Sequence, residues 1–421
     1  MTLRKQLAGF AISALAAAVS MQAVAGTVTT DGSDLVLGTK SGLTLDASDK
    51  SFGFKLGGRL QADYDSFDGL YTRNGNAANE AYFRRAILEL SGYAFTDWQY
   101  TLNYNFANEA GGGDWDEASI AYTGWKPVSI KVGRFDPDFG LEKATSSKWI
   151  TTIERSSIYD LASWVNDRDN GMGIQLQAKL ADSFYGSAGL NQPEDSNDED
   201  GQDDVQMNLR AVFAPMHEAG NVLHFGINYA DRGTDNSDGR LRSRLNVRGV
   251  TEDTSANANG RPFDTGGVAD AYENDTAWGL EAAFAAGPFS IQSEYMRVNI
   301  DAQSGSGRGD REATGYNAQL AWTITGEARG YKLGKFDAVK PSNSRMGAWE
   351  VVYRYDDIEA EESGFGSTDA QTHTLGVNWY ANNNVKVMLD YIMAETSDPS
   401  YNGAGVDDSG DAISARLQYA F

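Results

Sequence analysis

The C-terminal segment 413–421 alternates apolar and polar side chains and ends on an aromatic residue. A period of two residues is that of a β-strand whose two faces meet different surroundings. A strand of a soluble sandwich shows the same alternation, but a terminal phenylalanine on an exported chain is typical of the last strand of an outer-membrane barrel. The apolar members of the segment are Ile413, Ala415, Leu417, Tyr419 and Phe421.

The same alternation recurs along the chain, in segments near the roughly 9–11 residues that a tilted membrane strand needs. Long and short connections alternate between them, which favours long extracellular loops and short periplasmic turns. Strands can cross lipid only in a closed barrel, because every backbone polar group must be paired there. We therefore predict an all-β fold, a transmembrane antiparallel β-barrel of about 16 strands. The predicted strands are 52–66, 81–94, 97–107, 116–124, 127–135, 172–180, 182–190, 206–215, 221–231, 277–286, 288–299, 314–325, 346–356, 371–380, 383–396 and 411–421.

Residues 1–25 have the form of a cleaved secretory signal peptide. Arg4 and Lys5 precede a short apolar stretch, and Ala23-Val24-Ala25 is typical of a cleavage site. We expect residues 26–421 to form a single outer-membrane porin-like barrel domain, since no linker divides them. The absence of cysteine argues against a disulfide-stapled secreted fold.

Arginine recurs at alternate positions in the segment 240–248, at Arg240, Arg242 and Arg244, and again at Arg248. In an extended segment these side chains line one side, roughly 6–7 Å apart. Because like charges repel, a path for anions would explain the arrangement; a solvated basic loop is the alternative. The net charge of −24 does not exclude an anion path, because the local field decides selectivity and many acids lie in a predicted outer loop at 194–204.

Alternation also directs cations inward from the predicted strands. Lys55 and Arg59 face the lumen in 52–66, and Lys131 does so in 127–135. Arg85 faces inward in 81–94, which would turn Arg84 towards lipid, where a charge costs a few kcal/mol. We therefore expect Arg84 to lie near a rim or at a β-bulge.

Seven segments give the chain a close resemblance to the phosphate-selective porins O and P, over essentially the whole mature length. They are GTVTTDGSDLV (26–36), FKLGGRLQADY (54–64), AYFRRA (81–86), FDPDFGLEKATSSKWITTIER (135–155), GRLRSRLNVRGV (239–250), HTLGVNWYA (373–381) and DDSGDAISARLQYAF (407–421).

The resemblance implies a homotrimer of sixteen-stranded barrels in the Gram-negative outer membrane, with some loops folded into the lumen and lipopolysaccharide around it. It also implies three groups of residues that guide anions. The first is an arginine ladder of Arg240, Arg242, Arg244, Arg248, Arg261 and Arg155. The second is a constriction of Lys143, Ser146, Ser147, Asp116, Arg59, Arg84 and Arg85, in which Asp116 is expected to hold Lys143. The third is a periplasmic lysine cluster of Lys50, Lys55, Lys131, Lys332, Lys335 and Lys340.

Two constriction positions depart from the orthophosphate-preferring pattern that the resemblance suggests. That pattern has aromatic hydroxyls at the positions of Ile87 and Asp136. Losing two rings would widen the constriction and favour pyrophosphate or short polyphosphate. The added carboxylate of Asp136 would alternatively lower anion affinity generally, and both interpretations remain open.

Two other functions are weighed. A general anion or organic-acid porin of the same fold is the nearer alternative. An outer-membrane barrel enzyme would need a serine beside a base, and only His217, His224 and His373 are available, none with a nearby serine motif. We expect no cofactor, no metal site and no nucleic-acid partner.

Overall fold

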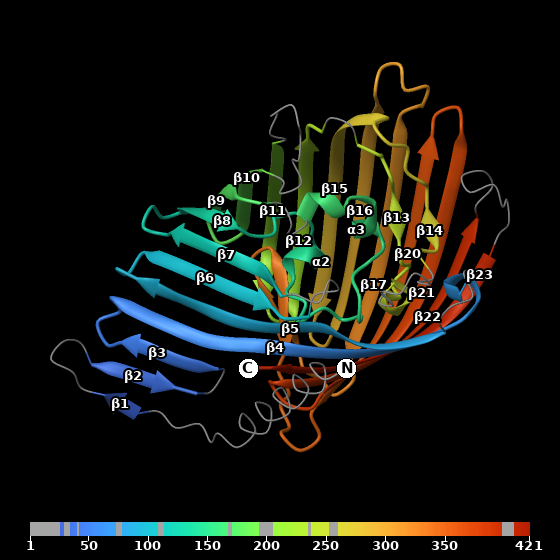
Figure 1. Ribbon diagram of the computed structural model, residues 1–421. Helices are drawn as coiled ribbons and strands as arrows, with labels where there is room; N and C mark the ends of the chain where they lie inside the picture. Colours follow the sequence, from blue (N-terminus) through green and yellow to red (C-terminus); the bar gives the residue numbers. More distant parts are fainter. Residues whose placement is uncertain are drawn as a thin grey trace, which may run out of the picture.

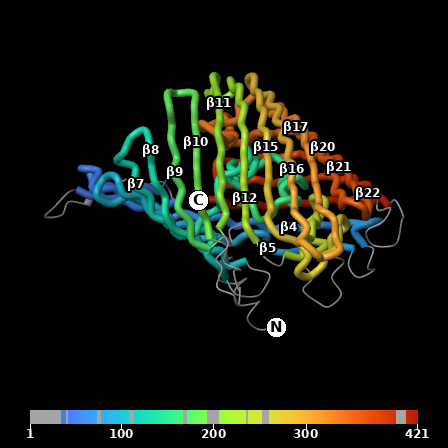
Figure 2. The backbone as a smooth tube through the Cα atoms, turned by 90° about the horizontal axis from the view of Figure 1, so that it is seen from above, coloured from blue at the N-terminus to red at the C-terminus, as the bar shows by residue number. Residues whose placement is uncertain are grey.

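Sixteen antiparallel strands close into a barrel within the residues that the computed structural model describes, as the alternation predicts (Figures 1 and 2). The described residues are 26–28, 34–39, 42–72, 78–107, 113–166, 171–192, 205–234, 237–251, 260–397 and 408–421. Each wall strand pairs with its neighbours in the chain, and β23 pairs with β4 to close the ring. The wall strands are β4 Phe52–Phe67, β5 Asn79–Ala94, β6 Trp98–Asn105, β7 Asp114–Tyr122, β8 Val128–Arg134, β9 Gly173–Leu180, β10 Phe184–Asn191, β11 Gln206–Glu218, β12 Asn221–Arg232, β15 Tyr272–Ala286, β16 Phe289–Ala302, β17 Arg311–Thr323, β20 Ala348–Glu362, β21 Gly366–Tyr380, β22 Val385–Ser397 and β23 Asp408–Ala420.

The faces of the last strand follow the sequence pattern. Arg416 and Gln418 are 1% exposed and face the interior, whereas Leu417 between them is 54% exposed on the outer surface. Ile413 is likewise exposed on the outside. The barrel is therefore polar within and apolar without, which suits a wall between water and lipid.

Several wall strands are longer than predicted at the long-loop end. β15 begins at Tyr272 rather than 277, and β20 runs to Glu362 rather than 356. Polar residues such as Glu359 and Glu361 continue the ladder beyond the apolar band, so hydrophobic alternation alone does not mark where pairing ends. In contrast, β6 to β10 have only seven to nine residues each.

Three short N-terminal strands were not predicted. β1 (Gly26–Val28), β2 (Leu35–Gly38) and β3 (Leu43–Ala47) extend the sheet at the short-turn end of β4. β3 pairs with β4 up to Leu56. Beyond Leu56, the C-terminal residue Phe421 pairs with β4 in its place. There Gly58 exchanges backbone hydrogen bonds of 3.0 Å with Phe421. A Cβ on Gly57 would lie 2.6 Å from the Phe421 carbonyl oxygen, so this junction requires glycine.

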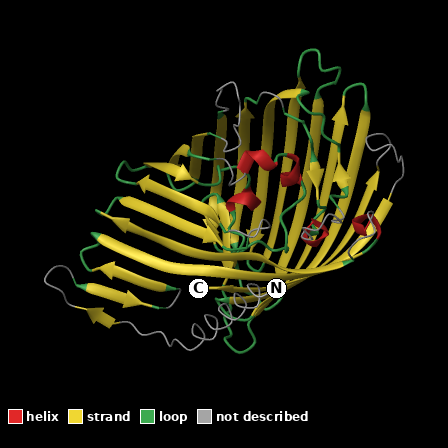
Figure 3. Ribbon diagram, in the orientation of Figure 1, coloured by secondary structure: helices red, strands yellow, loops and turns green. Residues whose placement is uncertain are grey.

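Chain segments fill much of the barrel interior (Figure 3). The connection from β8 to β9 carries α2 (Leu141–Ala144), α3 (Ile158–Leu161) and the 3-10 turn η2 (Ser163–Asn166). The connection from β12 to β15 adds β13 (Arg242–Ser243), η3 (Arg248–Thr251) and β14 (Phe263–Asp264), while η1 (Gly69–Thr72) follows β4. These segments share an interior apolar cluster that includes Tyr71, Ile158, Leu245 and Phe263. Loops folded into the lumen are therefore confirmed.

The long connection at 326–345 also enters the barrel, from the short-turn end. It forms the hairpin β18 (Arg329–Lys332) and β19 (Lys335–Val339). Tyr331 and Phe336 of this hairpin pack in one apolar cluster with Leu141 of α2. The hairpin thus supports the loop that approaches from the other end. Among the described residues, the search for a long apolar helix able to span a membrane finds none.

Candidate functional site

A β-bulge directs two consecutive arginines into the lumen. Gln61 pairs with Arg85 and Ala62 pairs with Phe83, which leaves Arg84 as the extra residue. Arg84 Nε donates to Glu154 Oε1 at 2.8 Å, and Arg85 Nη1 donates to Gln61 Oε1 at 3.1 Å. The expected bulge at Arg84 is confirmed, and it keeps the charge of Arg84 out of the lipid.

A second bulge, between β6 and β7, does the same for the acidic residues Asp116 and Glu117. Asn103 pairs with Glu117 and Tyr104 with Trp115, so Asp116 is the extra residue of the bulge. Asp116 accepts a hydrogen bond of 3.3 Å from Arg59, and Glu117 lies 3.6 Å from Lys131 Nζ. Carboxylates and cations therefore share the same part of the lumen.

The predicted constriction residues gather around Arg59 and the loop 141–148. Arg59 Nη1 donates to Ser147 Oγ at 2.9 Å and to Ser146 Oγ at 3.4 Å. Lys143 Nζ lies 3.5 Å from Asp136 Oδ2, and Asp136 is the more exposed member of that pair. Lys143 thus forms an ion pair with Asp136, one of the two positions that depart from the orthophosphate-preferring pattern.

Two residues of this cluster were missed. Lys148 Nζ lies 2.9 Å from Glu89 Oε2, and Glu89 Oε1 lies 3.8 Å from Arg59 Nε. The only sequence signals were the inward parity of Glu89 and the position of Lys148 directly after the paired serines. Neither signal reveals that the two side chains meet.

The backbone of residues 147–154, called the inner strap below, is fixed to the barrel wall. Its carbonyl oxygens accept hydrogen bonds from wall side chains on five neighbouring strands, β20 to β23 and β4, and from the hairpin residue Arg329. Asp390 in turn accepts a hydrogen bond of 2.7 Å from the Ile153 amide. The strap therefore holds the serines and Lys148 in place. The donor and acceptor pairs are Gln61 to Ser147, Gln418 to Lys148, Arg329 to Trp149, Lys386 to Ile150, Asn378 to Thr151, Arg416 to Ile153 and Arg354 to Glu154.

Arg155 also fixes backbone. Its Nε donates to the Glu142 carbonyl at 3.2 Å, and its Nη2 donates to the Thr145 carbonyl at 2.9 Å. Burial lowers the pKa of Arg155, and the nearby Glu142 opposes that shift. Arg155 therefore holds the backbone on both sides of Lys143.

The arginine segment is extended as far as Arg244, which includes the three alternating arginines, and the chain turns before Arg248. Arg240 and Arg242 are exposed, whereas the residue after each of them, Leu241 and Ser243, is buried. Leu245 and Asn246 then adopt positive φ angles of 48° and 68°, and η3 begins at Arg248. Contacts with η1 and with the wall hold this turn, since the Tyr71 hydroxyl donates to the Leu245 carbonyl at 2.9 Å and Asn246 donates to Asp356 of β20 at 2.9 Å.

The arginines nonetheless converge on Arg261. Burial lowers the pKa of Arg261 to about 10, and Arg244, Arg242 and Arg248 lower it further, whereas Asp160 opposes them. Arg240 lies at the edge of the group and pairs with Asp264. The fold thus produces a local excess of positive charge near the long-loop end.

The predicted lysines fall into smaller groups. Burial lowers the pKa of Lys335, and Lys332, Lys131 and Arg210 act in the same direction. Lys332 also pairs with Asp337 at 2.8 Å. Three of the six lysines are therefore close together inside the barrel. Of the others, Lys55 lies near Lys148, Lys340 near Asp337, and Lys50 in the turn before β4.

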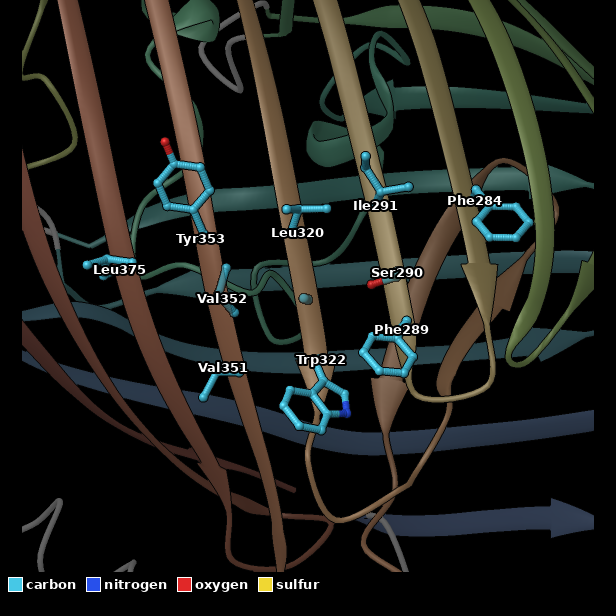
Figure 4. Close-up of a pocket in the computed structure, with 11 residues that line it drawn as sticks. Phe284, Phe289, Ser290, Ile291, Leu320, Trp322, Val351, Val352, Tyr353 and Leu375 are labelled. Carbon is cyan, nitrogen blue, oxygen red and sulfur yellow. The ribbon is translucent and has the colours of Figure 1, made fainter.

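The outer wall carries an apolar feature away from the lumen. An apolar groove of about 500 Å³ on the outer wall is lined by residues of β15 to β17, β20 and β21, among them Phe289, Leu320 and Leu375 (Figure 4). It belongs to the lipid-facing surface, since these side chains alternate outward. The acidic run at 194–204 and the signal segment 1–25 lie outside the described residues.

The histidines make contacts that differ from a catalytic triad. His224 bridges Tyr331 at 2.6 Å and Glu281 at 2.8 Å, and His373 contacts Tyr353 at 2.8 Å. His217 contacts the Ala214 carbonyl at 3.1 Å. Within the part of the chain that is described, no group of three or more metal-ligating side chains is found.

A sixteen-stranded barrel with interior loops and inward cations defines a porin-type protein. Residues 54–421 match the family described as Phosphate-selective porin O and P, and the chain belongs to that family. It is 52% identical to Porin O of Pseudomonas aeruginosa over 441 aligned residues, covering 100% of both chains. Its barrel is an outer-membrane barrel of the Gram-negative type.

Solved structures show the same fold at low identity. OmpT of Vibrio cholerae, expressed in the outer membrane, has a TM-score of 0.58 at 10% identity, with 88% of this chain and 98% of that chain covered. An anion-selective porin from Comamonas acidovorans has a TM-score of 0.56 at 11% identity, with 88% and 100% covered.

Proposed function

We propose that this protein is an anion-selective porin that admits phosphate, or pyrophosphate and short polyphosphate, into the periplasm. The observation that carries the proposal is the group of Arg242, Arg244 and Arg248 near Arg261, whose guanidinium lies 3.5 Å from the Arg242 carbonyl oxygen. Such an excess of positive charge is unfavourable until an anion arrives. Family membership and the name of the 52% identical relative support the same substrate class.

The proposed route follows the cations from the long-loop end to the short-turn end. The ladder Arg240, Arg242, Arg244, Arg248 and Arg261 draws anions inward, because a confined positive field raises their local concentration. Arg84 and Arg85 come next, and then Arg59, Lys143, Ser146 and Ser147 form the constriction. Lys131, Lys332 and Lys335 receive the anion at the exit.

The constriction chemistry suits an anion that has lost part of its hydration. Arginine offers a planar fork to phosphate oxygens, lysine offers a compact charge, and the serine hydroxyls replace water. Asp116 and Asp136 limit the affinity, because conduction requires that a bound ion also leave. Asp116 and Arg59 would also orient the serines, since Arg59 touches all three side chains.

The preference for a longer phosphate rests on Ile87 and Asp136. Ile87 is 4% exposed and has no hydroxyl to offer, and Asp136 places a carboxylate beside the central lysine. Both favour a wider, less specific opening than two tyrosine-like rings would give. A general anion or organic-acid porin is the second candidate. We further propose a non-enzymatic, homotrimeric protein surrounded by lipopolysaccharide; a solved trimer form of OmpT of Vibrio cholerae supports the oligomer.

The test is block of chloride current through the purified protein in a planar bilayer. Orthophosphate and pyrophosphate are titrated against wild type, Lys143→Glu and the control Lys126→Glu, which makes the same change at an exposed turn. The proposal predicts block of wild type and of the control, and a sharp loss in Lys143→Glu. Equal block in all three proteins would contradict the role of Lys143, and no block of wild type would contradict the phosphate preference.

A further inference from the structure

The pairing of β4 with β5 fixes the order of charged side chains along the lumen. From the long-loop end to the short-turn end, Gln61 lies opposite Arg85, Arg59 opposite Ile87, Gly57 opposite Glu89, and Lys55 opposite Ser91. Inward positions on one strand are two residues apart, which is roughly 6–7 Å. Glu89 and its partner Lys148 therefore lie one level beyond Arg59 along the proposed route.

Glu89 is shared between two cations. Lys148 Nζ lies 2.9 Å and 3.2 Å from its two oxygens, and Arg59 Nε lies 3.8 Å from one of them. The three side chains are between 10% and 19% exposed, so each is accessible from the lumen. Asp116 also contacts Arg59, so two carboxylates, Glu89 and Asp116, face Arg59, Lys148 and the nearby Lys55.

The electrostatics leave this level positive. Burial lowers the pKa of Lys148, and Arg59 and Lys55 lower it further, whereas Glu89 raises it. In addition, Arg59 Nε is buried and has no hydrogen-bond acceptor among the described residues. An anionic oxygen at this level would relieve the repulsion and satisfy that donor.

The backbone keeps Lys148 in this position. Its carbonyl accepts a hydrogen bond of 3.2 Å from Gln418 on β23, and the Ser147 carbonyl accepts one of 3.2 Å from Gln61 on β4. The side chains of Ser146, Ser147 and Lys148 therefore form a continuous series of donors. Arg59 contacts both serines, so the series connects the Arg59 level with the Glu89 level.

We propose that Lys148 forms a second phosphoryl subsite one level beyond Arg59, and that Glu89 is the carboxylate that the anion displaces from it. This inference rests on the proposed function and deepens it. Orthophosphate has one phosphoryl group and occupies one level at a time. Pyrophosphate has two, so it reaches Arg59 and Lys148 together. Lys148 and Glu89 therefore determine the preference for longer phosphates.

The test compares pyrophosphate and orthophosphate block of chloride current in Lys148→Met, Glu89→Gln and the control Lys126→Met. In Lys148→Met we expect the pyrophosphate blocking constant to weaken about ten-fold and the orthophosphate constant at most about two-fold. In Glu89→Gln we expect pyrophosphate block to strengthen about three-fold, because the competing carboxylate is gone. The control retains wild-type block of both anions. Heat-dependent mobility on gels verifies that every variant is a folded barrel.

The opposite signs expected at two touching residues separate this inference from general damage to the pore. Equal weakening of both anions in Lys148→Met, or weaker pyrophosphate block in Glu89→Gln, would overturn the second subsite while leaving the proposed function intact. Absence of block by either phosphate in wild type would overturn the proposed function itself.

Discussion

Arginines on two parts of the lumen have different surroundings. On the wall formed by β20 to β23, Arg354 and Arg416 are 1% exposed, and each meets carboxylates and strap carbonyls. Arg416, for example, contacts both Asp63 and Glu154. Near the long-loop end, Arg261 instead lies among arginines, with Asp160 as the opposing charge. An arginine inside the barrel is thus structural where carboxylates surround it, and under the proposed function it is available to anions where they do not.

The same contrast explains how an acidic chain can have an anion path. Many carboxylates lie inside the barrel beside buried arginines, where Glu281 neutralises Arg210 and Glu362 neutralises Arg311. The net charge of the chain includes those acids, although buried arginines already neutralise them. Selectivity depends on the cations that remain uncompensated along the route.

The largest expected effect is on stability, at the buried wall. Arg416→Met leaves Asp63 buried beside an apolar side chain, which costs about 3–5 kcal/mol of unfolding free energy. Urea unfolding in detergent micelles measures it. Arg297→Met is the control, because Arg297 and Glu312 form an exposed pair on the outer surface and its loss is expected to cost about 0–1 kcal/mol. Equal losses in the two variants would contradict the distinction between the two surroundings.

A smaller effect on stability is expected from a fall in pH, through Glu154 of the inner strap. Burial by itself raises its pKa, but Arg84 and Arg416 outweigh burial and hold the pKa well below the ordinary value of 4.5. A depressed carboxylate pKa stabilises the fold fully above 4.5, and this contribution is lost as the pH falls below that value. Between pH 7 and pH 3, the midpoint temperature of thermal unfolding should therefore fall more steeply in wild type than in Glu154→Gln. Parallel curves would show that Glu154 contributes nothing.

At the long-loop end we expect an effect on current and not on stability. Arg261→Gln removes the cation on which the ladder converges, and weakens phosphate block by about 1 kcal/mol, or roughly five-fold, at low salt. The difference should shrink at 1 M salt because the field is screened. Arg345→Gln, at an exposed position in the opposite turn, is the control. A loss that persists at high salt would indicate direct damage and not a field effect.

The smallest effect is expected at Asp136. Asp136→Asn frees Lys143 from a partly exposed pair, which is worth about 0.2–1 kcal/mol. Phosphate block should strengthen by that amount in concentration–block curves. Weaker block would mean that Asp136 orients Lys143 productively.

Alternation was sufficient to predict the barrel and its inward faces, because one apolar and one polar surface constrain every wall residue. For Arg84 it left two positions open, a rim or a bulge, and the structure shows the bulge. It could not predict that Arg59 joins Asp116 to the serines, since that contact joins β4, β7 and an interior loop. The turn at Leu245 and Asn246 was missed for a similar reason. Tyr71 and Asp356, both distant in sequence, impose it.

The reversal potential of wild-type protein in a potassium chloride gradient tests the central claim most directly. The chain carries a net charge of −24, so a pore governed by total charge would pass potassium. If the local field of the ladder and constriction cations governs selectivity, the reversal potential will approach the equilibrium potential of chloride. A potential near that of potassium would contradict the account.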